Sequence, residues 1–201
     1  NNPTGTSISI EQLKIIATNF NGIIVVDEAY IDFSNEPSFV QELANYPQLI
    51  VLQTLSKAYG LASLRLGMAF ANPTLIQLFN KIKPPYNIGG ATQHLVKKAL
   101  DNKQFVAESI QHIKVNKTLL IADLKHIKGV LTIFHSDANF ILVKFIRAQV
   151  LFDYLISNKI IARNRSNVEL CHDSIRITVG LESENKELIQ KIKLFYTIED
   201  V

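Results

Sequence analysis

Short aliphatic runs alternate with amphipathic stretches in the first half of the chain. Three of these runs, residues 22–27, 49–54 and 66–71, are rich in Ile, Val, Leu and Ala and are too short for helices of ordinary length. Continuous apolar runs of this kind are typical of strands that are buried on both faces of a parallel sheet. The sequence therefore predicts an α/β domain with a mainly parallel sheet.

Helix signals fill the gaps between these strands. Ser9 and Gln12 have the spacing of a capping box ahead of an apolar periodicity. Asn72 and Pro73 offer an N-cap and a first-turn proline for a helix over residues 75–82. Helices are therefore expected on either side of the predicted strands.

The second half of the chain has a different pattern. Two consecutive prolines within residues 83–87 predict a connection, and residues 92–127 are helical in character with a break near Asp101. The remainder predicts a smaller α+β unit with elements over residues 130–134, 139–145, 148–158, 160–163, 175–179 and 183–196. We expect residues 1–105 to belong to a large domain and residues 106–201 to a small C-terminal domain.

Composition narrows the class of protein. The 201 residues are 47% hydrophobic and 19% charged, which is typical of a globular chain with a substantial core. The net charge of +3 is small and the basic residues are spread along the chain, so neither nucleic acid nor a membrane is expected as a partner. A single cysteine, Cys171, and the lack of a secretory leader favour a reducing, cytoplasmic setting. The five histidines have no metal-ligand spacing, so no metal site is expected.

Two polar residues follow the first two predicted strands. Asp27 stands at the carboxyl end of its strand, where open α/β sheets place ligand-binding groups, although an acid there is often a helix cap or a loop anchor. Lys57 comes just after the second strand and, taken alone, is consistent with a solvated loop cation. A desolvated lysine, however, can form a Schiff base with an aldehyde, so a carbonyl cofactor is the alternative.

The order of several motifs gives a more specific interpretation. The chain resembles the fold-type I aminotransferases, which use pyridoxal 5'-phosphate (PLP), in three segments at the family's approximate spacing: Asn2-Pro3-Thr4-Gly5, Asp27-Glu28-Ala29-Tyr30 and Ser56-Lys57 with Arg65. Three further stretches, residues 55–62, 83–87 and 175–180, are similar to the histidinol-phosphate branch of that family. The resemblance extends from Asn2 to the last predicted helix and implies a PLP-binding large domain followed by a small α+β domain.

The resemblance implies a role in cofactor binding for seven residues. Lys57 would hold PLP covalently and then move the proton between substrate and cofactor. Asp27 would pair with the pyridinium nitrogen, and Asn2 and Tyr30 would donate hydrogen bonds to the phenolate oxygen, although Asn2 by itself is also typical of a turn before proline. The cofactor phosphate would be held by Thr54, Ser56 and Arg65.

The resemblance also implies a substrate site. Arg176 would bind the α-carboxylate of the amino-acid partner, although an arginine between two isoleucines also fits an outward-facing edge position. Arg163 would help to bind a substrate phosphate. Tyr86 could line the same pocket or pack as a core aromatic, and Asn139 could be a turn residue or an active-site amide.

The function implied by the branch is transamination between L-histidinol phosphate and 2-oxoglutarate, which gives imidazole acetol phosphate and glutamate in histidine biosynthesis. A related PLP-dependent decarboxylase of amino-acid phosphates and a non-catalytic fragment are the alternatives, because the electron-sink residues are shared. Family members are typically homodimers. The family's phosphate-binding turn and ring-stacking aromatic would precede Asn1, so we expect these 201 residues alone to be weakly active or inactive.

Overall fold

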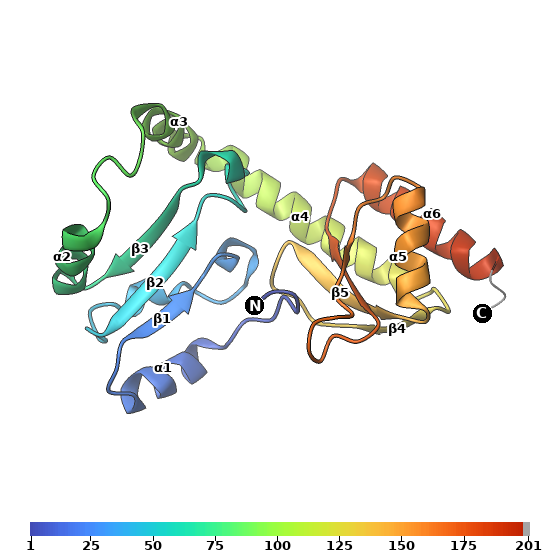
Figure 1. Cartoon of the computed structure of the whole chain (residues 1–201), viewed down its shortest axis with the longest axis horizontal. Coiled ribbons are helices and arrows are strands. Elements are labelled where there is room, and N and C mark those ends of the chain that lie inside the picture. Colours follow the sequence, from blue (N-terminus) through green and yellow to red (C-terminus); the bar gives the residue numbers. More distant parts are fainter. Residues whose placement is uncertain (199–201) are drawn as a thin grey trace. The chain divides into compact units, whose positions relative to one another are not determined.

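A computed structural model describes residues 1–198 and divides the chain into two compact units. We call Ile8–Ile110 the first unit, and Asn1–Ser7 together with the residues from Gln111 onward the second unit. Figure 1 shows the elements along the chain. The expected division at residues 105 and 106 stays a prediction.

The first unit contains a three-stranded sheet with short helices around it. Its elements, in chain order, are α1 (Ile10–Asn19), β1 (Ile24–Asp27), η1 (Ile31–Phe33), η2 (Phe39–Glu42), β2 (Leu49–Thr54), η3 (Ala62–Leu64), β3 (Gly67–Ala71), α2 (Pro73–Ile82) and α3 (Gly90–Asp101). The helix α4 (Lys103–Leu124) begins in this unit. All three strands predicted from the aliphatic runs are present.

Local sequence signals define where the helices begin. Ser9 caps α1, because its hydroxyl accepts from the backbone N–H of Gln12 while the Gln12 side chain accepts from the backbone N–H of Ser9, both at 3.3 Å. Asn72 caps α2 in the same way, accepting from the N–H of Thr74 at 2.9 Å, and Pro73 occupies the first turn. Both predicted caps are confirmed.

The prediction of a mainly parallel sheet is wrong for these three strands. The strand order is β1-β2-β3, and β1 pairs with β2 in parallel, but β2 and β3 are antiparallel. A parallel return needs a crossover that carries the chain back across the sheet, usually a helix. The connection over residues 55–66 contains only the single turn η3, so the chain reverses and the sheet is mixed.

The expectation that these strands are buried on both faces holds only for the first half of β2, where Leu49, Ile50 and Val51 are each at most 5% exposed. It is wrong for β1 and β3. One face packs on a small core made by α1, η2 and β2, whose buried members are Ala17, Phe39, Leu49 and Val51. On the other face Ile23 and Val25 are 56% and 55% exposed. An aliphatic run indicates a strand, but it does not show whether a second layer of the same chain covers both of its faces.

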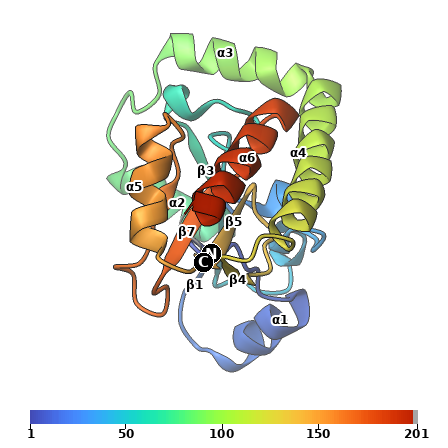
Figure 2. The same ribbon diagram turned by 90° about the vertical axis from the view of Figure 1, so that its right-hand side faces the viewer.

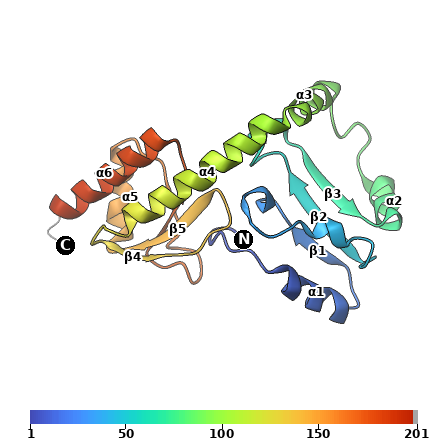
Figure 3. The same ribbon diagram turned by 180° about the vertical axis from the view of Figure 1, so that it is seen from behind.

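The helical region after α2 is interrupted as predicted. Residues 83–89 form the connection, and Asn102 separates α3 from α4, so the two appear as separate helices (Figure 3). No helix within residues 1–198 is long and apolar enough to span a bilayer.

The second unit is a layer of helices on an antiparallel sheet. Its elements after α4 are β4 (Val130–Ile133), β5 (Phe140–Phe145), α5 (Ala148–Ser157), β6 (Arg163–Asn164), β7 (Ser174–Thr178) and α6 (Glu182–Ile198), and the sheet order is β4-β5-β7-β6. Figure 2 shows α4, α5 and α6 gathered over this sheet. The α+β prediction is therefore confirmed, although the strand expected over residues 160–163 is only two residues long.

A single core joins the helices of the second unit to one face of its sheet. The helices contribute Leu120, Leu124, Leu151, Leu155 and Ile192, and the strands contribute Ile141, Val143, Phe145 and Ile175, each at most 1% exposed. Alternation along β5 and β7 directs Phe140, Leu142 and Arg176 to the opposite face. That second face carries the polar groups considered next.

Candidate active site

The two strand ends predicted to carry the reactive groups lie side by side in the first unit. β1 and β2 are parallel neighbours, so the segments after Asp27 and Thr54 leave the same edge of the sheet. Tyr30 lies just after β1 and Lys57 just after β2, and the Lys57 Nζ lies 5.2 Å from the centroid of the Tyr30 ring. The ammonium group therefore rests against an aromatic ring, an arrangement in which the ring quadrupole attracts the cation.

Backbone hydrogen bonds stabilise the turn that carries Lys57. The N–H of Gly60 donates to the carbonyl of Lys57 at 3.1 Å, and the N–H of Leu61 donates to the carbonyl of Leu55 at 3.0 Å. Leu55 is 2% exposed and anchors the turn in the core, whereas the Lys57 side chain is exposed. Lys57 is thus positioned by a fixed turn but is not desolvated in this structure.

Two hydroxyl groups lie together at the start of the same turn. The Thr54 hydroxyl lies 2.9 Å from that of Ser56 and accepts from the Ser56 backbone N–H at 3.1 Å. It also lies 3.2 Å from the carbonyl of Leu66 at the start of β3. Two neighbouring hydroxyl groups are suited to bind an anion.

Arg65 ends η3 in an unusual backbone conformation. Its φ of 54° and ψ of 40° lie in the left-handed region, and its Nη1 donates to the carbonyl of Ala62 at 3.1 Å. Non-glycine residues adopt this backbone conformation infrequently. Where they do, they are often found at functional sites. The guanidinium of Arg65 is exposed.

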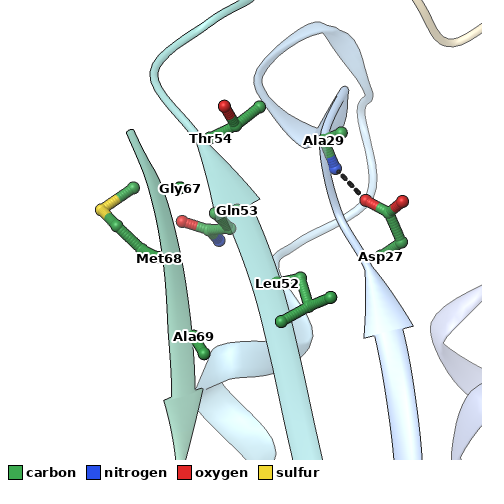
Figure 4. Close-up of a pocket in the computed structure, with 8 residues that line it drawn as sticks. All are labelled: Asp27, Ala29, Leu52, Gln53, Thr54, Gly67, Met68 and Ala69. Carbon is green, nitrogen blue, oxygen red and sulfur yellow. Dashed lines mark hydrogen bonds between the residues drawn. The ribbon is translucent and has the colours of Figure 1, made fainter. Parts of the chain in front are cut away.

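Asp27 lines an open pocket at the edge of the three-stranded sheet. The pocket has a volume of about 400 Å³ and is formed by the ends of β1 and β2 and the beginning of β3 (Figure 4): its lining residues are Asp27, Ala29, Leu52, Gln53, Thr54, Gly67, Met68 and Ala69. Asp27 Oδ1 accepts from the N–H of Ala29 at 2.9 Å. The carboxylate is exposed.

Arg176 and Asn2 meet in the second unit. Arg176 Nη1 donates to Asn2 Oδ1 at 2.9 Å, and the guanidinium carbon lies 4.9 Å from the centroid of the Phe140 ring. β7 lies between β5 and β6, so Arg176 is not on an edge strand, and that alternative is wrong. Arg163 is directly opposite Arg176 on β6 and is exposed. Two arginines therefore lie on neighbouring strands of one sheet.

A short N-terminal segment brings Asn2 to this place. The carbonyl of Gly5 accepts from the N–H of Asp137 at 2.8 Å, and the Asp137 carboxylate accepts from the N–H and hydroxyl of Ser7 at 3.2 and 2.5 Å. Gly5 has a φ of 81° and packs so closely on Ser136 that a β-carbon would overlap its side chain. Residues 1–7 are thus fastened to the loop before β5.

The loop that receives this segment is itself braced by a lysine. Lys117 Nζ donates to the carbonyls of Ser136 and Ala138 at 2.8 and 2.9 Å. Burial lowers the pKa of Lys117, and the charge of Lys114 lowers it further. Partial burial raises the pKa of Asp137, but the hydrogen bonds from Ser7 and the nearby His135 outweigh this effect and lower it overall.

The remaining sequence candidates are less constrained. Tyr86 is 100% exposed with a φ of 57°, so the alternative of a packed core aromatic is wrong. Asn139 directly precedes β5, and its carbonyl accepts from the N–H of Val179 at 3.0 Å. Among residues 1–198 no group of three or more His, Cys, Asp and Glu side chains could hold a metal ion.

The structure thus distributes the candidates over the two units. Seven of them belong to the first unit: Tyr86 lies in the connection before α3, and six lie at the edge of the sheet, namely Asp27, Tyr30, Thr54, Ser56, Lys57 and Arg65. Asn2, Arg163 and Arg176 belong to the second unit. The sequence interpretation missed Glu28, a buried carboxylate beside Asp27, because only its contacts with residues distant in the chain distinguish it.

This combination of folds and side chains corresponds to a known family. Residues 1–192 match the family described as aminotransferase class I and II, so the chain belongs to that family. The resemblance inferred from the order of the motifs is confirmed.

The chain is similar to particular members of the family and to their solved structures. The histidinol-phosphate aminotransferase of Cytophaga hutchinsonii is 45% identical over 195 residues, which cover 97% of this chain and 56% of that protein. The crystal structure of the histidinol-phosphate aminotransferase from Clostridium acetobutylicum matches with a TM-score of 0.92 at 25% identity, covering 98% of this chain and 62% of that one. A decarboxylase from Sulfurospirillum multivorans matches with a TM-score of 0.87 at 25% identity, over 96% and 53% of the respective chains. The chain spans little more than half the length of the curated relative.

Proposed function

We propose that the whole protein is a PLP-dependent aminotransferase that transfers the amino group of L-histidinol phosphate to 2-oxoglutarate, giving imidazole acetol phosphate and glutamate. The observation that carries this proposal is the contact of Lys57 Nζ with the Tyr30 ring at the edge where Asp27 lies. The 45% identity to a histidinol-phosphate aminotransferase supports this choice of substrate.

The residues of the first unit fit PLP. The cofactor needs an amine for its aldehyde, a carboxylate for its ring nitrogen and donors for its phosphate. Lys57 offers the amine, Asp27 an exposed carboxylate at the pocket, and the paired hydroxyls of Thr54 and Ser56 with Arg65 offer the donors. When bound, PLP supplies an electron sink for the negative charge that develops on the substrate carbon.

The protein's own groups would then position the cofactor and move the proton. Lys57 would hold the cofactor covalently through its amine, and the same amine would carry a proton to or from the substrate carbon. Asp27 keeps a proton on the ring nitrogen, since a nearby carboxylate raises the pKa of that nitrogen. Tyr30 would donate a hydrogen bond to the phenolate oxygen.

Two arginines would recognise the substrates. Arg176 binds the carboxylate of glutamate, a task for which the planar guanidinium fork is well suited. Arg163 would bind the phosphate of histidinol phosphate. Because both substrates are anions, cationic groups can serve each half-reaction in turn, and the contact of Arg176 with Asn2 holds the first of these groups in place.

Organisation at the level of the whole protein follows from the same proposal. Residues 1–105 would be part of the PLP-binding large domain of a fold-type I enzyme, and residues 106–201 would form the small C-terminal domain. The protein works as a cytoplasmic homodimer with no nucleic-acid or membrane partner. Sedimentation of the whole protein tests the dimer, and a monomer that retains full activity would contradict it.

Product analysis tests the reaction. The whole protein, loaded with PLP, is incubated with histidinol phosphate and 2-oxoglutarate, and glutamate is measured. A parallel incubation contains an O-phosphorylated amino acid, which has a carboxylate to lose, and carbon dioxide is measured there. We expect glutamate to form in equal amounts with imidazole acetol phosphate. The similarity to a decarboxylase makes release of carbon dioxide from an amino-acid phosphate the second candidate outcome, and carbon dioxide without amino transfer would reject the aminotransferase.

A further inference from the structure

Glu28 follows Asp27 in the chain and carries a carboxylate that the proposed chemistry does not use. Successive strand residues point to opposite faces of a sheet, so Asp27 faces the pocket and Glu28 faces the core. Asp27 is exposed, whereas Glu28 is only 7% exposed. A buried carboxylate without partners would be strongly unfavourable, so its contacts show what it does.

Three donors from two distant segments satisfy this carboxylate. Glu28 Oε1 accepts from the backbone N–H of Phe39 at 2.6 Å, and Oε2 accepts from the Ser38 hydroxyl at 2.7 Å and from Gln53 Nε2 at 2.9 Å. Gln53 Nε2 also lies 3.1 Å from the Ser38 hydroxyl. The side chains of Glu28, Ser38 and Gln53 therefore form a closed triangle, which we call the Glu28 triangle.

The Glu28 triangle joins the segments that carry the proposed cofactor residues. The N–H of Glu28 donates to the carbonyl of Leu52 at 2.8 Å, and its carbonyl accepts from the N–H of Ile31 at 3.1 Å. These bonds fix the backbone between Asp27 and Tyr30. Gln53 directly precedes Thr54, so the same triangle fastens the end of β2 to the end of β1.

Stability alone does not explain a charged network at this place. Its neighbours on the same face are apolar, since Phe39 and Val51 belong to the core of the first unit. Replacing a buried ionic network by apolar side chains of similar volume often leaves stability unchanged or raises it. Hydrogen bonds are directional. This network therefore favours one arrangement of the three segments that carry Glu28, Ser38 and Gln53 over other arrangements.

We propose that Glu28, with Ser38 and Gln53, is a positioning group that holds Asp27 and Tyr30 in the orientation that PLP requires. This inference rests on the proposed function for the identity of the cofactor. Glu28 does not touch the reacting atoms and acts only through the residues on either side of it.

A matched pair of variants tests the proposal in the whole protein. Glu28→Gln removes the charge at nearly constant shape and leaves an NH₂ group facing donors. Glu42→Gln is the control, because Glu42 also lies in the first unit. The substitution removes the ion pair in which Glu42 Oε1 lies 2.7 Å from Lys14 Nζ. Absorbance titration with PLP should show binding weakened between about tenfold and 100-fold in Glu28→Gln, as small misplacements of binding groups do. The control should stay within about twofold.

Amide hydrogen exchange without cofactor gives a second readout. In Glu28→Gln, the amides of Phe39, Glu28 and Ile31 should exchange about tenfold faster, while amides of α1 and β3 keep their protection. Faster exchange throughout the first unit would mean a general loss of stability and would overturn the positioning role. Unchanged exchange at the three amides would overturn it too.

The two proposals fail in different ways. If the unaltered protein binds no PLP, the proposed function is wrong, and the exchange pattern still decides whether Glu28 orders the segment. If the unaltered protein binds PLP and Glu28→Gln binds it equally well, only the positioning role is wrong.

The swapped pair Glu28→Gln with Gln53→Glu returns one carboxylate and one amide to the triangle, and we expect it to recover most of the lost affinity.

Discussion

At the scale of single residues, the proposed chemistry depends most directly on Lys57. Replacing it with alanine removes the only group in the proposed site that can hold the cofactor covalently and move the proton. We expect Lys57→Ala to lower kcat/KM by at least about 10³-fold, the usual order for loss of a nucleophile and its proton transfer. The visible absorbance band of covalently bound PLP should be lost together with the activity.

An exposed lysine of the same unit provides the control for this change. Lys83 follows α2 and is exposed in the structure, so Lys83→Ala removes an equal charge without touching the proposed site. Its kcat/KM should equal that of the unaltered protein within experimental error. If Lys57→Ala and Lys83→Ala behaved alike, Lys57 would have no catalytic role.

The two arginines of the second unit allow a test of substrate choice. Arg163→Lys should raise KM for histidinol phosphate about tenfold and leave KM for glutamate unchanged, because a point charge replaces a bidentate fork at the phosphate. Arg176→Lys should raise KM for glutamate by a similar factor. Steady-state kinetics of each half-reaction measure both values, and equal effects on both substrates in Arg163→Lys would contradict the assignment.

Single residues could be proposed from the sequence where several motifs share one order along the chain. Lys57, Asp27 and Asn2 each have an ordinary alternative when taken singly, and their shared order favours the role in cofactor binding. The contact of Lys57 with Tyr30 then followed from two parallel strands that end at one edge. The exposure of Asp27 was not predictable, because it depends on what covers the strand end and not on the strand itself.

At the scale of elements, the N-terminal segment offers a prediction that depends on pH. The pKa of Asp137 is lower in the folded protein than in the unfolded chain, so the ionised carboxylate stabilises the fold at neutral pH. As the pH falls below about 4, the carboxylate of the unfolded chain is protonated first. The contribution to stability is therefore lost below that pH. Asp137→Asn should remove this dependence and reduce the free energy of unfolding at pH 7 by about 1 kcal/mol, after allowance for partial exposure.

Urea unfolding at several pH values measures this contribution. Asp101→Asn serves as the control, since Asp101 is exposed at the end of α3. The unaltered protein and the control should lose stability in parallel as the pH falls from 6 to 3, a range of about three units around the usual aspartate pKa, while Asp137→Asn should lose less. Parallel curves for all three proteins would show that Ser7 and His135 do not stabilise the Asp137 carboxylate.

Elements were predicted well where the signal is local. The caps of α1 and α2 and the break at Asn102 depend on residues within one helical turn, and each was confirmed. Pairing in the three-stranded sheet depends on how the chain returns from β2, and the aliphatic pattern of β3 is the same for either direction. The antiparallel pairing of β2 and β3 could therefore not be predicted from the sequence pattern, because it depends on how residues 55–66 fold.

At the scale of the whole molecule, the described residues contain two separate cores, one in each unit. A cavity in one core should therefore affect mainly the unit that contains it. Leu151 is completely buried in the second unit, and Leu151→Ala should destabilise that unit by about 3 kcal/mol. Phe39→Ala makes the corresponding cavity in the first unit, where Phe39 is 1% exposed.

Hydrogen exchange resolved along the chain distinguishes the two cavities. Leu151→Ala should accelerate exchange in β5, β7 and α6, and Phe39→Ala should accelerate it in β1 and β2. Loss of protection in both units from either single change would show that the chain unfolds as one cooperative body. That result would contradict the expected independence of the two cores.

The adjacency of Asp27, the last residue of β1, and Glu28, which directly follows it, also limits how this strand can change during evolution. Side chains alternate with a period of two, so insertion or deletion of one residue within residues 23–26 would exchange the two carboxylates between the faces. The reactive acid would then enter the apolar core, and the anchoring acid would face solvent. Substitution of one aliphatic residue by another keeps the phase of the strand. We therefore expect related sequences to vary freely in the side chains of β1 but to preserve its length, because the spacing itself encodes which acid meets the cofactor.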